Sequence, residues 1–80
     1  MNNDLINNIG RIHTTELGVE RIKKNLSLNT NDAVIWCREK IKESGEIFIK
    51  GKNWYVHADD CIITVNAYSF TIITAHKKKL

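Results

Sequence analysis

The sequence predicts an α+β domain in which two or three N-terminal helices pack on one face of a four-stranded antiparallel meander sheet. Two observations lead to this prediction. Before Gly45 the apolar residues recur at helical spacing, and after it they cluster and alternate as they do in strands. Only a few residues separate the strand-like runs, which allows antiparallel hairpins but not the long crossovers that parallel strands need.

Two helices are predicted in the first part of the chain. Asp4–Ile12 has apolar residues at helical spacing, and Gly10 weakens its end. Thr14 and Thr15 offer hydroxyl groups that cap a second helix, Thr15–Leu26. The apolar stripe predicted for this second helix consists of Leu17, Val19, Ile22 and Leu26.

A third helix is predicted to begin at a cap residue, Asn29 or Thr30, and to end before Gly45. Its predicted apolar face consists of Ala33, Val34, Trp36, Cys37 and Ile41. We expect this helix to meet the sheet in a core that contains Trp36, Ile41, Ile63, Val65 and Ile73.

The predicted strands are Glu46–Lys50, Trp54–Ala58, Cys61–Ala67 and Phe70–Lys77. Since helices cover only one face of this sheet, the other face stays exposed. Alternation along the strands collects polar and aromatic side chains on that exposed face. They are Tyr55, His57, Thr64, Asn66, Thr74 and His76. In the last strand, Ile72 is expected on this same face, with Ile73 and Ala75 on the other.

Length and composition narrow the class of protein. Residues 1–80 are predicted to form one domain, because 80 residues lie near the lower limit for independent folding. The first residues do not resemble a signal peptide, and the two cysteines do not make a disulfide scaffold. We therefore expect a cytoplasmic protein with no membrane partner. The net charge of +3 permits binding to a polyanion without requiring it.

Four separated stretches resemble an uncharacterised bacterial family, domain of unknown function 3781. They are His13-Thr14-Thr15-Glu16-Leu17-Gly18, Gly51-Lys52-Asn53-Trp54-Tyr55-Val56, Ile63-Thr64-Val65-Asn66-Ala67 and Ile73-Thr74-Ala75-His76-Lys77. Their order and spread cover nearly the whole chain. This resemblance implies no known activity.

The predicted architecture also resembles that of the barnase, RelE and colicin group of small ribonucleases, with Thr74-Ala75-His76 as the local match. That resemblance implies metal-independent RNA cleavage. Two histidines could act as its general acid and base because imidazole titrates near neutral pH, and His13 and His76 are the predicted pair. His13 precedes a helix start, where free amides favour phosphate. No glutamate is expected on the exposed face, so a histidine would replace the glutamate base of barnase-like enzymes.

Six further residues are predicted to bind nucleic acid without taking part in chemistry. The cationic side chains would contact phosphates, and an aromatic ring beside the basic turn would stack on a base. The six residues are Arg21, Lys24, Lys52, Tyr55, Asn66 and Lys77. Trp54, which points to the other face from Tyr55, is expected in the core.

Two alternative functions remain open. One is a non-catalytic interaction module, including a homodimer, that uses the open sheet face or an edge strand. The other is a small-molecule binder, which needs an enclosed pocket. No cofactor and no metal site are predicted, because Cys37, His57 and Cys61 match no common zinc spacing.

Overall fold

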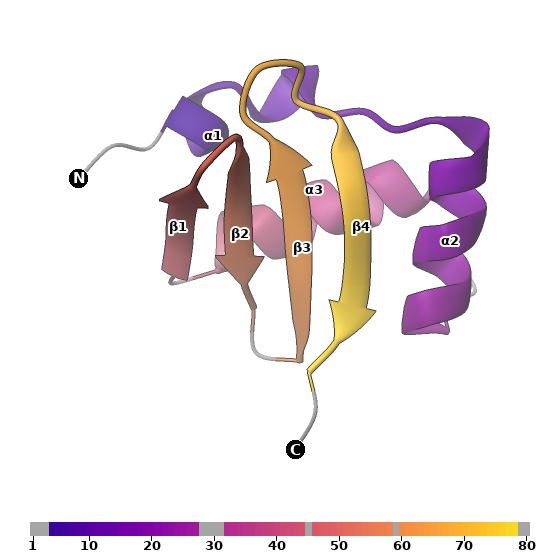
Figure 1. The fold of residues 1–80 in the computed structure, drawn as a ribbon. Coiled ribbons are helices and arrows are strands. Elements are labelled where there is room, and N and C mark those ends of the chain that lie inside the picture. Colours follow the sequence, from indigo (N-terminus) through magenta and orange to yellow (C-terminus); the bar gives the residue numbers. More distant parts are fainter. Residues whose placement is uncertain (1–3, 28–31, 45, 59, 79–80) are drawn as a thin grey trace.

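The computed structural model describes residues 4–27, 32–44, 46–58 and 60–78, in which helices are followed by strands (Figure 1). The helical elements are α1 (Asp4–Asn7), the 3-10 helix η1 (Ile9–Arg11), α2 (Glu16–Leu26) and α3 (Ala33–Glu43). The strands are β1 (Glu46–Lys50), β2 (Asn53–His57), β3 (Cys61–Asn66) and β4 (Ile72–Lys77). The predicted α+β class is confirmed. None of the helices in these ranges is long and apolar enough to cross a membrane.

The predicted helix Asp4–Ile12 is divided into α1 and η1. The break falls at Asn8, whose backbone (φ −116°, ψ 28°) is not helical. Leu5 and Ile12, two of the apolar residues at helical spacing, are buried despite the break. Arg38 of α3 fixes the end of this segment, because its Nη2 donates a hydrogen bond to the carbonyl oxygen of Ile12 (2.7 Å).

Both longer helices begin with a side-chain cap. Thr15 caps α2, as predicted, and its Oγ1 accepts a hydrogen bond from the backbone N–H of Gly18 (3.0 Å). Asp32 caps α3, and its Oδ1 accepts from the backbone N–H three residues later (3.0 Å). The predicted caps Asn29 and Thr30 lie outside the described residues.

The buried stripe of α2 lacks Leu17 and includes Gly18, which was not predicted, while Val19 is only partly buried. Gly18, Ile22 and Leu26, which recur every four residues, are buried in the structure. Leu17 is instead 73% exposed, so its predicted place in the stripe was wrong. Each helical residue is rotated by about 100° from the one before it, which turns Leu17 away from the side that Gly18 buries.

The four strands form an antiparallel meander in the order β1-β2-β3-β4, as predicted. A two-residue turn joins β1 to β2, between the paired residues Lys50 and Asn53. Its first residue, Gly51, has φ 62°, a conformation that glycine adopts without strain and that suits a type II′ turn. The tight turn fixes the register of the first hairpin.

β4 departs from strict alternation at a bulge. Thr64 pairs with Thr74, but the next residue, Val65, pairs with Ile72, which leaves Ile73 as an extra residue. Ile72 therefore lies on the helix-covered side and is 2% exposed, whereas Ile73 is 40% exposed. The predictions that Ile73 is a core residue and that Ile72 lies on the exposed face were both wrong, because one inserted residue reverses the alternation beyond it.

The core lies between the sheet and the helices. α3 crosses behind the strands, and α2 lies beside β4 at one side of the sheet (Figure 1). Three of the predicted core residues, Ile41, Ile63 and Val65, are 0% exposed and confirm that part of the prediction. Trp36 is only partly buried and packs against the outside of the core.

The outer edge of β4 is occupied by the chain segment that leads into α2 and by α2 itself. Thr14 Oγ1 donates a hydrogen bond to the carbonyl oxygen of Ile72 (3.0 Å), and Asn25 Nδ2 donates to that of Ala75 (3.2 Å). The carbonyl oxygen of His13 accepts from the N–H of Ile72 (2.7 Å). β1 lies at the opposite edge, and among the described elements it packs extensively against β2 alone.

Candidate functional site

The face of the sheet away from the helices carries cross-strand rows of side chains, which we call the open face. The register between the strands places residues of β1, β2, β3 and β4 directly opposite one another. One row consists of Phe48, Tyr55, Thr64 and Thr74, and the next consists of Glu46, His57, Ile62 and His76. The residues predicted for this face do share it, and the structure adds Phe48 and Glu46. Thr64, however, is only 6% exposed, so the prediction that its side chain is exposed was wrong.

Aromatic rings gather on the β1–β2 side of the open face. Phe48 is 51% exposed, and Tyr55 lies opposite it on β2 and is half-buried. The ring of Phe48 also meets the imidazole of His57 edge to face, with the ring centroids 5.4 Å apart. Trp54 points to the other face and is buried against Phe70, as expected. An exposed aromatic surface of this kind offers planar rings on which a nucleic-acid base can stack.

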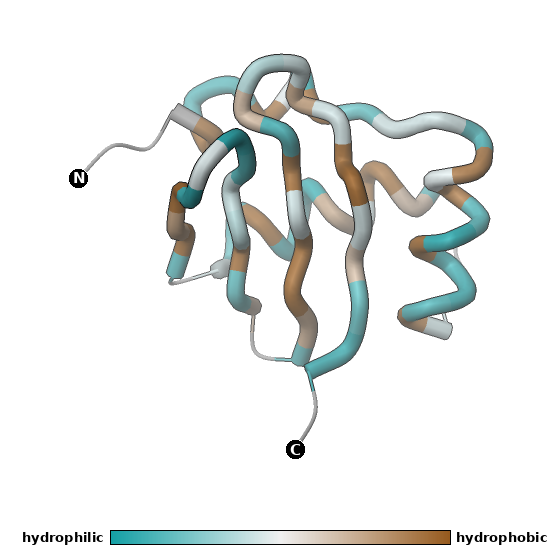
Figure 2. The backbone as a smooth tube through the Cα atoms, in the orientation of Figure 1, coloured by the Kyte–Doolittle hydropathy of each residue, from teal (hydrophilic) through white to brown (hydrophobic). Residues whose placement is uncertain are grey.

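A shallow depression of about 380 Å³ adjoins these rings at the end of β4. It is lined by His57, Ile62, His76, Lys77 and Lys78. Figure 2 shows this end of β4 as hydrophilic, in contrast to the hydrophobic stretch of β3 beside it. Among the described residues that line the depression, Lys77 and Lys78 give it a cationic character, which favours a phosphate group.

Glu46 corrects the expectation that no glutamate lies on the open face. It pairs with His57 across the β1–β2 hairpin, so both side chains project from the same face. A carboxylate beside an imidazole is an arrangement that general acid–base chemistry uses. The sequence prediction missed Glu46 because alternation was followed only along the second, third and fourth strands.

His13 and His76 are not brought together. His13 forms an isolated parallel bridge with Thr71, before β4 begins, whereas His76 lies near the end of β4. Five residues of strand, at about 3.3 Å each, separate these two positions by about 16 Å. Both ring nitrogens of His13 are engaged, Nδ1 with the carbonyl oxygen of Arg11 (2.9 Å) and Nε2 with Thr71 Oγ1 (3.1 Å). These contacts give His13 a structural role.

His57 is the histidine that does lie near His76. His57 on β2 and His76 on β4 lie on either side of Ile62 of β3, and both line the same depression. Two strand spacings put their Cα atoms about 10 Å apart, close enough for both imidazoles to reach one bound group. Sequence reasoning placed both on the exposed face, but only the register shows that they share one row.

The six residues predicted to bind nucleic acid are dispersed over the molecule. Lys77 lines the depression, and Tyr55 lies in the aromatic row beside it. Lys52 is exposed in the β1–β2 turn. Asn66 lies on the open face, but its Oδ1 accepts hydrogen bonds from the N–H groups of Tyr68 and Ser69 (2.9 Å each), which holds the β3–β4 turn in place.

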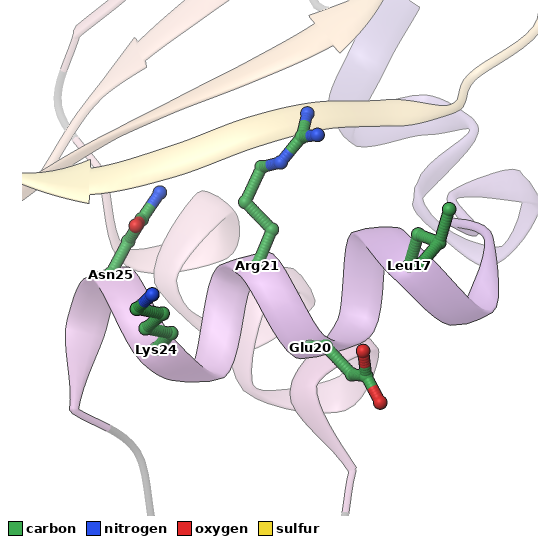
Figure 3. A pocket seen from close by; sticks show the side chains of 5 residues that line it. All are labelled: Leu17, Glu20, Arg21, Lys24 and Asn25. Atoms are coloured by element: carbon green, nitrogen blue, oxygen red, sulfur yellow. The ribbon is translucent and has the colours of Figure 1, made fainter.

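Arg21 and Lys24 line a separate open hollow of about 430 Å³ along α2. Figure 3 shows Arg21 and Asn25 pointing from α2 toward β4, with Glu20 pointing away. Both basic side chains are exposed, and the side chain of Asn25 donates its hydrogen bond to β4. This hollow lies beside β4 at the flank of the sheet, apart from the depression that His57 and His76 share.

The two cysteines are buried free thiols. Burial raises the pKa of the Cys37 thiol to about 12, and the neighbouring Cys61 adds to the rise. Burial also raises the pKa of Cys61 to about 11, with a further contribution from the carboxylate of Asp60. Both are therefore neutral core side chains at neutral pH. Within the described part of the chain, no three histidine, cysteine or acidic side chains are grouped to hold a metal ion.

The fold and the open face define a small α+β protein with a half-covered meander sheet. Residues 6–76 match the family model described as "Protein of unknown function (DUF3781)", and the chain belongs to this family. The resemblance predicted from four stretches of sequence is thereby confirmed, whereas the architectural resemblance to small ribonucleases stays a prediction. Searches of curated proteins and of solved structures each returned no match.

Proposed function

We propose that this protein binds single-stranded RNA on the open face of its sheet. One observation supports the proposal above all: the exposed aromatic row directly adjoins the cationic depression. Stacking on Phe48 and Tyr55 would hold bases, while Lys77 and Lys78 would neutralise phosphates. Hydrogen bonds to base edges are not needed for this mode of binding, so little sequence preference is expected.

The proposal is tested with a fluorescently labelled oligouridine strand and anisotropy titrations. Wild-type affinity is expected to fall as salt is raised from about 50 mM to about 200 mM, because bound lysines release counterions. Tyr55→Ala should weaken binding by about fivefold or more through lost stacking, whereas Tyr55→Phe keeps the ring and should bind nearly as wild type. A DNA strand of matching sequence measures any preference for RNA.

A matched pair of lysine variants separates the depression from general surface charge. Lys77→Gln should lower the magnitude of the logarithmic salt slope by about one, as expected when one phosphate contact is lost. Lys42→Gln removes the same charge from α3, behind the sheet, and should leave the slope unchanged. Equal effects of both substitutions, or no wild-type binding at low salt, would refute a dedicated site.

RNA cleavage without metal is a second candidate function, favoured by one observation: His57 and His76 line the same depression. One imidazole would accept the proton of the 2′-hydroxyl and the other would protonate the leaving oxygen. With a chelator present, His57→Ala or His76→Ala should slow cleavage by about 10²–10⁴-fold. His13→Ala should not slow it beyond any loss of folded protein. Intact RNA after prolonged incubation with wild type would leave binding alone.

A further inference from the structure

The outer edge of β1 is exposed and apolar at its centre. Phe48 and Ile49 are 51% and 64% exposed, which is high for large hydrophobic residues of a strand. Ile47, which precedes Phe48 in the strand, is partly buried and packs against the core. Since β1 begins the strand order, its second side has no strand partner in the described part of the chain. Such an edge can pair with another strand.

The sequence of β1, Glu46-Ile47-Phe48-Ile49-Lys50, is complementary to itself in the antiparallel direction. If two copies align with Phe48 opposite Phe48, each Glu46 faces a Lys50 and each Ile47 faces an Ile49. Directly opposite residues in an antiparallel pair share a face and interact most strongly. Both ion pairs and the apolar contacts therefore form in one register, and shifting it by one residue removes the two ion pairs.

The backbone of β1 is in phase with this register. The two-residue turn makes Lys50 and Asn53 a hydrogen-bonded pair, and bonded and non-bonded pairs alternate from there along the hairpin. The N–H and C=O groups of Phe48 thus point to β2, while those of Ile47 and Ile49 point out of the sheet. The proposed alignment places the outward groups of Ile47 against those of Ile49 in the second copy, which allows about four hydrogen bonds between chains.

We infer that the protein forms a two-fold symmetric homodimer through β1, centred on Phe48, which joins two four-stranded sheets into one of eight strands. Each Phe48 would cover the other in a closely spaced, non-hydrogen-bonded pair. Ile49 would extend the core of the second copy beside Ile47. The two open faces would lie on the same side of the joined sheet, with their aromatic rows continuous. This inference does not depend on RNA binding.

Charge reversal at the two ends of β1 tests both the interface and its register. Wild type is expected to sediment with twice the mass of the single chain as concentration rises from the low-micromolar range. Lys50→Glu places two acidic residues against each other at both ends and should weaken the dimer by about tenfold or more. Glu46→Lys should do the same with basic residues. The double variant E46K/K50E restores both opposite-charge pairs and should dimerise like wild type.

A mixing experiment removes any ambiguity from folding. Lys50→Glu chains and Glu46→Lys chains, each expected to dimerise weakly alone, should associate more tightly with one another when combined. Both charged pairs at the ends of β1 are then oppositely charged. All three variants alter exposed side chains and should keep the wild-type circular dichroism spectrum. A wild type that stays monomeric to near-millimolar concentration, or a dimer that the single reversals leave intact, would overturn the inference.

Discussion

β4 and β1 are the two edge strands of the sheet, and each has one side that faces no other strand of the meander. Side chains and backbone from residues 13–25 cover the outer side of β4, and Thr14 and Asn25 donate to two of its carbonyl oxygens. β1 has no comparable cover within the described residues, and it exposes Phe48 and Ile49. An unpaired edge promotes unwanted association unless it is covered or charged.

The two edges of the sheet are therefore protected in different ways. The outer edge of β4 is covered by α2 and the segment before it, and the same contacts attach α2 to the sheet. β1 instead begins with Glu46 and ends with Lys50. These opposite charges disfavour pairing with most strands but allow pairing with a strand of complementary charge. Substitutions near β4 should therefore affect folding, whereas substitutions on β1 should affect association.

The largest expected contrast is between two isoleucines, one at each edge. Ile22 of α2 is 1% exposed, so Ile22→Ala should lower the free energy of unfolding by about 2–5 kcal/mol through the cavity it leaves. Ile49 is 64% exposed, and Ile49→Ala should change that free energy by only about 0.5 kcal/mol. Urea unfolding at low protein concentration, where a monomer is expected, measures both. Similar losses for the two variants would show that the edges are energetically equivalent.

Ionisation of the two thiols at alkaline pH should weaken the interior rather than an edge strand, because Cys61 lies on β3 and Cys37 on α3. Unfolded thiols ionise near pH 9, while the raised pKa values of about 11 and about 12 keep the folded thiols protonated. Stability from the thiols is therefore complete below pH 9 and is lost as pH rises toward 11. Each thiol accounts for about 1.4 kcal/mol per pH unit, or about 2–3 kcal/mol for both at pH 10.

Urea unfolding at pH 8 and at pH 10 measures this loss, and the variant C37A/C61A provides the control. All other side chains are common to both proteins, so only the difference between the two pH dependences belongs to the thiols. The variant should start from a lower stability but lose less of it between the two pH values. Equal losses would mean that the thiols reach solvent in the folded protein.

Features set by local sequence were predicted correctly, whereas features set by the alignment between strands were not. The helices, the four strands and the polar open face followed from period and turn spacing, because these are local signals. The bulge at Ile73 reversed the expected sides of two isoleucines, since one inserted residue leaves no clear trace in composition. The pairing of His57 with His76 in one row, and of Glu46 with His57, depends on register between strands, which alternation within one strand does not determine.

Gly18 provides the finest test of how the β4 edge is closed. Alanine within a helix is usually favoured over glycine by about 1 kcal/mol. At Gly18, however, an added Cβ would overlap the hydroxyl of Thr14, the group that donates to the carbonyl oxygen of Ile72. Gly18→Ala is therefore expected to lower the free energy of unfolding by about 1–2 kcal/mol despite its better helix propensity. Gly10→Ala, where an added Cβ meets open space, is the matched control and should be nearly neutral.

A double-mutant cycle shows whether Thr14 causes that loss. Thr14→Ala alone should cost about 1 kcal/mol, because the carbonyl oxygen of Ile72 loses its side-chain donor. With Thr14 already replaced, the hydroxyl that Gly18→Ala would displace is absent, so the second substitution should cost about 1 kcal/mol less than it does in wild type. Additive losses would instead place the strain at Thr15 Oγ1, 3.2 Å from the added Cβ, or at the Cβ of Thr14, 3.3 Å away, which alanine retains. In either case the loss would not come from the Thr14 hydroxyl, and the hydrogen bond from Thr14 to β4 would tolerate a bulkier residue at position 18.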